Sequence, residues 1–189
     1  MREGSIGILA IQETHLTDEF TEQFESLFSN HLKLFYSPNP NTRNVRGVAL
    51  VINRKLINID DTTVQTVVPR RAIAVSILWQ NDQKINVLAI YTPNPPGEIK
   101  EFWRTIQAKV NRNATDTQDI LLSNFNLIED TIDRLPTRQD NTQVMEALRN
   151  FKTTHNLIDG WRRSHPNEKG YSWSRETDGV QSRINRIYI

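Results

Sequence analysis

The chain has 189 residues, enough for one domain with a sizeable core, and its net charge is only +1. It contains no cysteine, which excludes disulfides, thiol catalysis and cysteine-based zinc sites. No run approaches the roughly 20 apolar residues that span a bilayer, so we predict an intracellular protein, cytoplasmic or nuclear, with no membrane segment.

The N-terminal quarter predicts a strand, a helix and a loop. The apolar run 5–11 is long enough for a buried strand, and Thr17 suits the N-cap of a helix because acidic residues follow it. Pro38, Pro40 and neighbouring asparagines predict a loop. Large apolar residues recur at helical spacing after Thr17, and we interpret them as a stripe that faces the core: Phe20, Phe24, Leu27 and Phe28.

The middle of the chain is rich in β-branched residues. These runs predict strands over 47–52, 64–68, 72–79 and 84–91. Asn81-Asp82 is a turn signal between the last two runs, which therefore form a hairpin. A helix is predicted over 98–112, with its apolar face at Ile99, Phe102, Trp103, Ile106 and Val110.

The remaining segments complete a mixed pattern of strands and helices. We predict a strand at 120–122, a helix over 141–154, and two last strands at 170–174 and 184–189. Helices fall between groups of strands, which indicates a layered α/β or α+β fold. No repeat or linker interrupts the sequence, so we expect a single domain over 1–189.

Four polar segments lie at or just after predicted strands, where functional groups gather. Glu13 in the first segment is a candidate Mg²⁺ ligand, since Mg²⁺ prefers hard oxygen donors and frequently takes only one or two carboxylates. Taken singly, each segment is ordinary loop chemistry, because asparagine and proline favour turns. The segments are Gln12-Glu13-Thr14, Tyr91-Thr92-Pro93-Asn94, Ser123-Asn124-Phe125-Asn126 and the stretch from Ser182 to Tyr188.

Taken together and in order, these segments resemble the endonuclease/exonuclease/phosphatase superfamily, especially the endonuclease domain of fungal LINE-type retroelements. The resemblance rests on ILAIQETHL, GVALVINR, VLAIYTPN, ILLSNFNLIEDTIDRLP and LIDGWRRSHPNEKGYSWSR, followed by QSRINRIYI. It implies a four-layer α/β/β/α sandwich that hydrolyses phosphate esters with Mg²⁺ or Mn²⁺, and DNA as the partner.

Four site residues match the family's motifs. Glu13 corresponds to the metal-binding glutamate of the Q-E-T motif. Tyr91 and Asn94 correspond to the tyrosine and asparagine of Y-x-P-N, with the tyrosine near the scissile phosphate. Asn126 corresponds to the asparagine of G-D-F-N, which orients the nucleophile and the phosphate.

Two site residues depart from the family's pattern. Asn124 stands where the family has the aspartate that activates water, and Asn185 where it has the aspartate that orients the catalytic histidine. A carboxamide accepts no proton, and the loss of one general base typically lowers the rate by about 10²–10⁴. We therefore expect impaired catalysis and weakly bound metal.

The ends of the chain generate a further expectation. The family's first strand would precede Met1, and its S-D-H motif with the catalytic histidine would follow Ile189. We expect a sandwich without its usual first and last strands, and a homodimer that covers the exposed sheet edges.

The other candidate residues are arginines, histidines and tryptophans. We predict that Arg162 and Arg183 contact phosphates, and we interpret Trp161 and Trp173 as packing residues. The histidines lie in no matching motif and are interpreted as solvated or capping residues: His15, His31, His155 and His165.

Three interpretations of function remain. We favour a retroelement-derived, endonuclease-like domain with lost or crippled catalysis that acts by binding nucleic acid or a protein. The alternative is an active Mg²⁺- or Mn²⁺-dependent endonuclease that uses a non-standard base. A third is a nuclease deliberately silenced by the two Asp-to-Asn changes.

Overall fold

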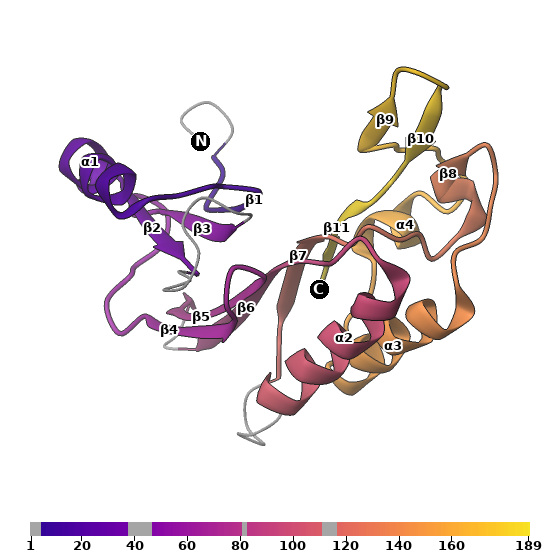
Figure 1. The fold of residues 1–189 in the computed structure, drawn as a ribbon. Coiled ribbons are helices and arrows are strands. Elements are labelled where there is room, and N and C mark those ends of the chain that lie inside the picture. Colours follow the sequence, from indigo (N-terminus) through magenta and orange to yellow (C-terminus); the bar gives the residue numbers. More distant parts are fainter. Residues whose placement is uncertain (1–4, 38–46, 81–82, 111–116) are drawn as a thin grey trace. The chain divides into compact units, whose positions relative to one another are not determined.

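The chain divides into two compact units, Met1–Tyr91 and Thr92–Ile189, in a computed structural model that describes residues 5–37, 47–80, 83–110 and 117–189 (Figure 1). The predicted loop at Pro38 and Pro40 and the predicted Asn81-Asp82 turn lie outside the described residues. The assignment of a single domain to 1–189 stays a prediction.

The first unit contains a three-stranded antiparallel sheet in the order β1-β3-β2. Its strands are β1 (Ile8–Gln12), β2 (Leu32–Tyr36) and β3 (Val48–Asn53). Every residue of β3 except Asn53 is buried, because the strand has a partner on both sides and is almost wholly apolar. The predicted strands near 5–11 and 47–52 are confirmed, but the predicted burial of the first is wrong, since no residue of β1 is buried. Strand β2 has too weak an alternation to be predicted.

Three more antiparallel strands of this unit follow one another in the order β4-β5-β6. They are β4 (Thr63–Val68), β5 (Ala72–Leu78) and β6 (Lys84–Tyr91). The predicted hairpin between the last two is confirmed, with a register that runs from Ala72 opposite Ile90 to Leu78 opposite Lys84. The last five residues of β6 are buried, so its C-terminal end is held firmly where Tyr91 lies.

Helix α1 (Asp18–Phe28) begins where it was predicted but does not bury the face that was predicted. Thr17 caps it, with Oγ1 accepting the N–H of Phe20 at 3.2 Å. None of its residues is buried, and Leu27 is 66% exposed. Only Phe24 of the predicted stripe packs against the cluster of Leu34, Ala49 and Val51. The core-facing stripe is therefore wrong for the others, Phe20, Leu27 and Phe28, since helical spacing does not say how many residues the neighbouring sheet covers.

The second unit is built on two helices that pack against each other, α2 (Pro96–Val110) and α3 (Thr142–Thr154) (Figure 1). All five apolar residues predicted for the first of them are buried. The core lies around Trp103, whose ring centroid is 5.2 Å from that of Phe151 and 6.2 Å from that of Phe125. Asn141 caps α3 by accepting the N–H of Gln143 at 2.9 Å.

Two small sets of strands complete this unit, and the predicted mixed α/β class is confirmed. Strand β7 (Ile120–Asn124) pairs antiparallel with β11 (Asn185–Tyr188). A second sheet has the order β8-β10-β9, with β8 (Arg134–Leu135), β9 (Trp173–Arg175) and β10 (Val180–Ser182).

Two short helices and one exposed tryptophan complete the second unit. A short 3₁₀ helix, Thr131–Asp133, precedes β8, and helix α4 covers Gly160–Ser164. Trp173 is 41% exposed, so its interpretation as a packing residue is wrong. Among the described residues, no helix has the length and apolarity needed to cross a membrane.

His155 is a buried histidine at the C-cap of α3. Its Nδ1 accepts the N–H of Gln118 at 3.2 Å, and its ring lies 4.4 Å from the ring of Phe151. This burial lowers the pKa of His155 below its ordinary value of 6.5. The interpretation as a capping residue holds for His155, but the side chain is not solvated.

The His155→Gln variant should have a flatter pH dependence of stability than the parent. In the unfolded chain His155 binds a proton near pH 6.5, whereas in the folded protein its pKa is lower. Protonation therefore favours the unfolded state, and the stability of the parent falls as the pH drops from about 7 to about 5. Urea unfolding at several pH values measures this slope. The exposed His31→Gln change serves as the control for the substitution itself, and equal slopes in the two variants would contradict the assignment.

Candidate active site

In the first unit, the structure brings Glu13 and Tyr91 together. Glu13 directly follows β1, Tyr91 ends β6, and the hydroxyl of Tyr91 donates to Oε1 of Glu13 at 2.5 Å. Tyr91 is buried and Glu13 is exposed. The guanidinium of Arg71 lies 5.0 Å from the ring centroid of Tyr91 and donates to its carbonyl at 3.2 Å. A firmly held phenol thus orients an accessible carboxylate.

This arrangement fits a metal ion only in part. Glu13 offers one exposed carboxylate, and Mg²⁺ is frequently held by one or two carboxylates together with water and substrate phosphate. Within the described parts of the chain, no three histidine, cysteine or acidic side chains gather closely enough to hold a metal ion. The described residues therefore supply one ligand and no metal cage.

In the second unit, Asn124 and Asn185 lie opposite each other. They are register partners at the ends of β7 and β11, so their side chains project from the same face of the strand pair. Oδ1 of Asn124 accepts the N–H of Asn126 at 3.0 Å. This bond identifies which end of the Asn124 carboxamide is the oxygen. The NH₂ group therefore lies at the other end, where it can donate to a ligand. Asn185 is exposed and Asn124 is half-buried.

Asn126 organises the neighbouring loop. Its Nδ2 donates to the carbonyl of Thr92 at 2.8 Å, and the N–H of Thr92 donates to the carbonyl of Asn124 at 3.2 Å. Its φ is +50°, a left-handed conformation that asparagine tolerates better than most residues. Asn94, two residues beyond Thr92, is exposed and takes no part in these bonds. Three of the four asparagines predicted for the site are therefore linked by pairing or by hydrogen bonds.

Ser172 is a positioning residue that the motifs did not indicate. Its Oγ accepts two consecutive backbone N–H groups, those of Ile184 at 3.0 Å and Asn185 at 2.9 Å. The N–H of Ser172 in turn donates to the carbonyl of Ser182 at 3.1 Å. These bonds fix the start of β11 and thereby the position of Asn185.

A buried ion-pair network lies next to the start of β11. Arg183 is 5% exposed and donates to both oxygens of Asp133, at 2.9 and 3.0 Å, and to Asp159 at 2.6 Å. Arg162 also donates to Asp133. Two arginines thus face two carboxylates, and the set is neutral. The indole of Trp161 covers this network, with Arg183 and Arg162 at 4.8 and 4.9 Å from its ring centroid, which supports its interpretation as a packing residue.

The pairing shifts the ionisation of the network toward its charged forms. Burial alone raises the pKa of Asp159, but hydrogen bonds from Arg183 and from the N–H of Arg162 bring it below its ordinary value. Burial acts against the charge of Arg183, yet Asp133 and Asp159 raise its pKa overall. Arg162 and Arg183 therefore both have carboxylate partners within the protein. Their contact with phosphate stays a prediction, and these partners do not support it.

The Asp133→Asn variant should be strongly destabilised. Its carboxylate is 1% exposed and neutralises Arg183, and removing one partner of a buried pair typically costs about 3–5 kcal/mol. Chemical denaturation measures the loss in the free energy of unfolding. The control is Asp178→Asn, because Asp178 pairs with Arg175 at the surface and should contribute little. Equal effects of the two changes would contradict the assigned role of the network.

Known structures share the fold that contains these groups. The chain is similar to AP endonuclease LMAP from Leishmania major, with a TM-score of 0.79 and 14% identity over 100% of this chain and 71% of that one. It is also similar to an endonuclease/exonuclease/phosphatase family protein from Bacteroides thetaiotaomicron, with a TM-score of 0.61 and 13% identity over 99% and 70% of the two chains.

A third similar structure comes from a retroelement. The endonuclease domain of TRAS1, a telomere-specific non-LTR retrotransposon, matches with a TM-score of 0.57 and 14% identity over 83% of this chain and 66% of that one. Comparison of the sequence with protein-family models and with curated proteins gives no match. The chain therefore has the endonuclease/exonuclease/phosphatase fold, and the resemblance predicted from its motifs is confirmed at the level of fold.

Proposed function

We propose that this domain, which has a nuclease-type fold, binds the phosphate groups of a nucleic acid. We further propose that it cleaves the phosphodiester bonds slowly or not at all. The observation that carries the proposal is the orientation of Asn124. Its carboxamide oxygen accepts the N–H of Asn126, so the NH₂ group is the end of the side chain turned away from this bond and offers N–H donors. An aspartate in the same position would keep a second oxygen to accept a proton from water.

The same replacement favours binding of an anion. Asn124 and Asn185 are neutral, so they do not repel a phosphate as two carboxylates would, and their NH₂ groups can donate to its oxygens. Asn185 is exposed and held by Ser172, which lowers the cost of ordering it on binding. DNA is the partner that we infer, from the nuclease fold of the similar structures.

Metal has a secondary role in this proposal. Glu13, oriented by Tyr91, is the residue that would hold Mg²⁺ or Mn²⁺ weakly, together with water and phosphate. A bound ion would supply charge neutralisation for the phosphate. Active cleavage with a non-standard base is the second candidate, and this Glu13–Tyr91 pair is the observation that favours it.

The Asn124→Asp variant should bind DNA more weakly than the parent when metal is absent. The new carboxylate can still accept the N–H of Asn126, so the loop is kept, but its charge repels phosphate and its lost NH₂ group costs about one hydrogen bond, roughly tenfold in affinity. A gel-shift titration of a short duplex in EDTA at low salt measures this. The matched control is the exposed Asn156→Asp, and equal affinities of both variants, or no binding by the folded parent, would contradict the proposal.

Supercoiled-plasmid nicking tests the catalytic half of the proposal. With Mg²⁺ or Mn²⁺, the parent should nick no faster than Glu13→Gly or an EDTA control, because Asn124 and Asn185 carry carboxamides, which cannot act as general bases. Nicking by the parent that requires both the metal and Glu13 would overturn impaired catalysis in favour of the second candidate. Nicking gained on restoring aspartate at 124 and 185 would show that the remaining groups are competent.

A further inference from the structure

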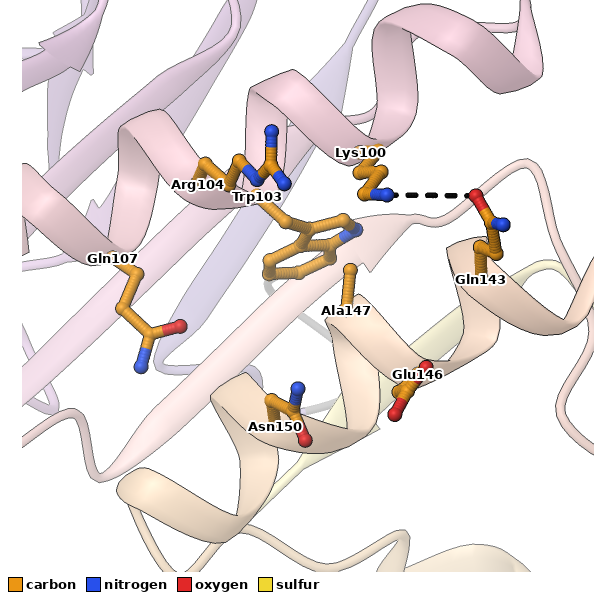
Figure 2. A pocket seen from close by; sticks show the side chains of 8 residues that line it. All are labelled: Lys100, Trp103, Arg104, Gln107, Gln143, Glu146, Ala147 and Asn150. Atoms are coloured by element: carbon orange, nitrogen blue, oxygen red, sulfur yellow. Dashed lines mark hydrogen bonds between the residues drawn. The ribbon is translucent and has the colours of Figure 1, made fainter.

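A groove of about 320 Å³ lies between α2 and α3, on the helical layer of the second unit (Figure 2). Helix α2 contributes Lys100, Trp103 and Arg104, and α3 contributes Gln143, Glu146 and Ala147. On both helices the contributing residues recur at i, i+3 and i+4, so each helix presents one continuous face. The volume is at the small end of the range for small-molecule sites.

The wall formed by α2 carries two cations, Lys100 and Arg104, whose partners among the described residues bind them only weakly. Nζ of Lys100 contacts the neutral carboxamide oxygen of Gln143 at 3.4 Å, a long hydrogen bond (Figure 2). Arg104 lies 3.6 Å from Glu101, and both side chains are about two-thirds or more exposed, so solvent screens this pair. Lys100 and Arg104 are one helical turn apart and are close enough to contact one small anion together.

The floor of the groove adds a buried donor. Trp103 is 1% exposed, and its Nε1 is among the buried side-chain nitrogens of the described residues that have no hydrogen-bond partner. Figure 2 shows the indole nitrogen on the side of the ring nearer to Lys100 and Gln143. A buried N–H without an acceptor is unfavourable, and an oxygen bound beside Lys100 would lie on the side of the ring that carries this N–H.

From this geometry we propose that the groove binds a small carboxylate-bearing molecule. The carboxylate is held by Lys100 and Arg104 and accepts the N–H of Trp103, while Ala147 leaves room for the carbon skeleton. Glu146 on the opposite wall disfavours additional negative charge, so monocarboxylates and zwitterionic amino acids fit better than polyanions. This site is independent of the candidate active site and of its proposed function.

Titration by heteronuclear NMR tests the site directly. The chain has four tryptophans and hence four indole N–H signals, and the loss of one signal in Trp103→Phe assigns the signal of Trp103. Acetate, glycine and succinate are the probes, with chloride and inorganic phosphate at equal ionic strength as competing anions. We expect acetate and glycine to shift the Trp103 signal saturably, with the other three indole signals unchanged.

Variants at three positions that line the groove test the site, with Arg104 exposed and Lys100 and Ala147 half-buried. Lys100→Gln and Arg104→Gln should each weaken carboxylate binding about tenfold or more, as should filling the groove by Ala147→Leu. Arg149→Gln, an exposed cation on α3 outside the groove, is the matched control and should leave binding unchanged. Glu146→Gln should raise the affinity for succinate. An unmoved Trp103 signal in the folded parent, an equal response to chloride and phosphate, or equal binding by Arg104→Gln and Arg149→Gln would each overturn the proposal.

Discussion

The buried pairing of Arg183 with Asp133 is the interaction on which the second unit depends. Asp133 ends a short helix, and Arg183 joins β10 to β11, so their two hydrogen bonds tie together segments 50 residues apart in the sequence. The N–H of Arg183 also donates to the carbonyl of Asp133 at 2.8 Å. Since Asn185 follows Arg183 by two residues, the ion pair fixes the strand that presents the candidate site. Burying the charge of Arg183 or Asp133 alone would be costly. Only the arrangement that brings the two together offsets this cost, so the ion pair favours one placement of the two segments.

The candidate site differs from a hydrolytic one by few atoms. Asn124 accepts the N–H of Asn126, and an aspartate could accept the same N–H, so either side chain is compatible with this loop. What changes is the proton chemistry, because the group facing outward donates where a base would accept. Under the proposed function, binding and cleavage are therefore separable, because the N–H donors and the supporting network do not depend on a base.

Much of the fold was predictable from the sequence. The apolar face of α2 was correct at all five positions, because its helix packs with a full stripe against the core. The stripe of α1 was wrong for a physical reason: the sheet beside it covers only one of its four large apolar residues, and the periodicity of a helix carries no information about the area of its neighbour. The short strands β8 and β10 have two and three residues, too few for an alternating pattern to be recognised.

The candidate site was predictable in its residues more than in its contacts. Glu13 and Tyr91 were each predicted from motif positions at strand ends, and the structure joins their side chains by a hydrogen bond that was not predicted. Ser172 and Asp133 were missed, since a serine that accepts two backbone N–H groups and a buried acid both depend on tertiary neighbours. Arg162 and Arg183 were predicted as phosphate ligands because a sequence shows an arginine's charge but not its carboxylate partners.

The left-handed backbone at Glu13 and Asn126, with φ of +54° and +50°, has a consequence for mutational scanning. A residue held in this region typically costs about 1–3 kcal/mol, and the cost changes with the side chain. An alanine at either position would alter the conformational preference of the main chain as well as remove a functional group. Glycine is the better reference residue at both positions, because it accepts the left-handed conformation without strain. Comparison of the glycine and alanine variants would separate what the side chain does for a ligand from what it does for the loop.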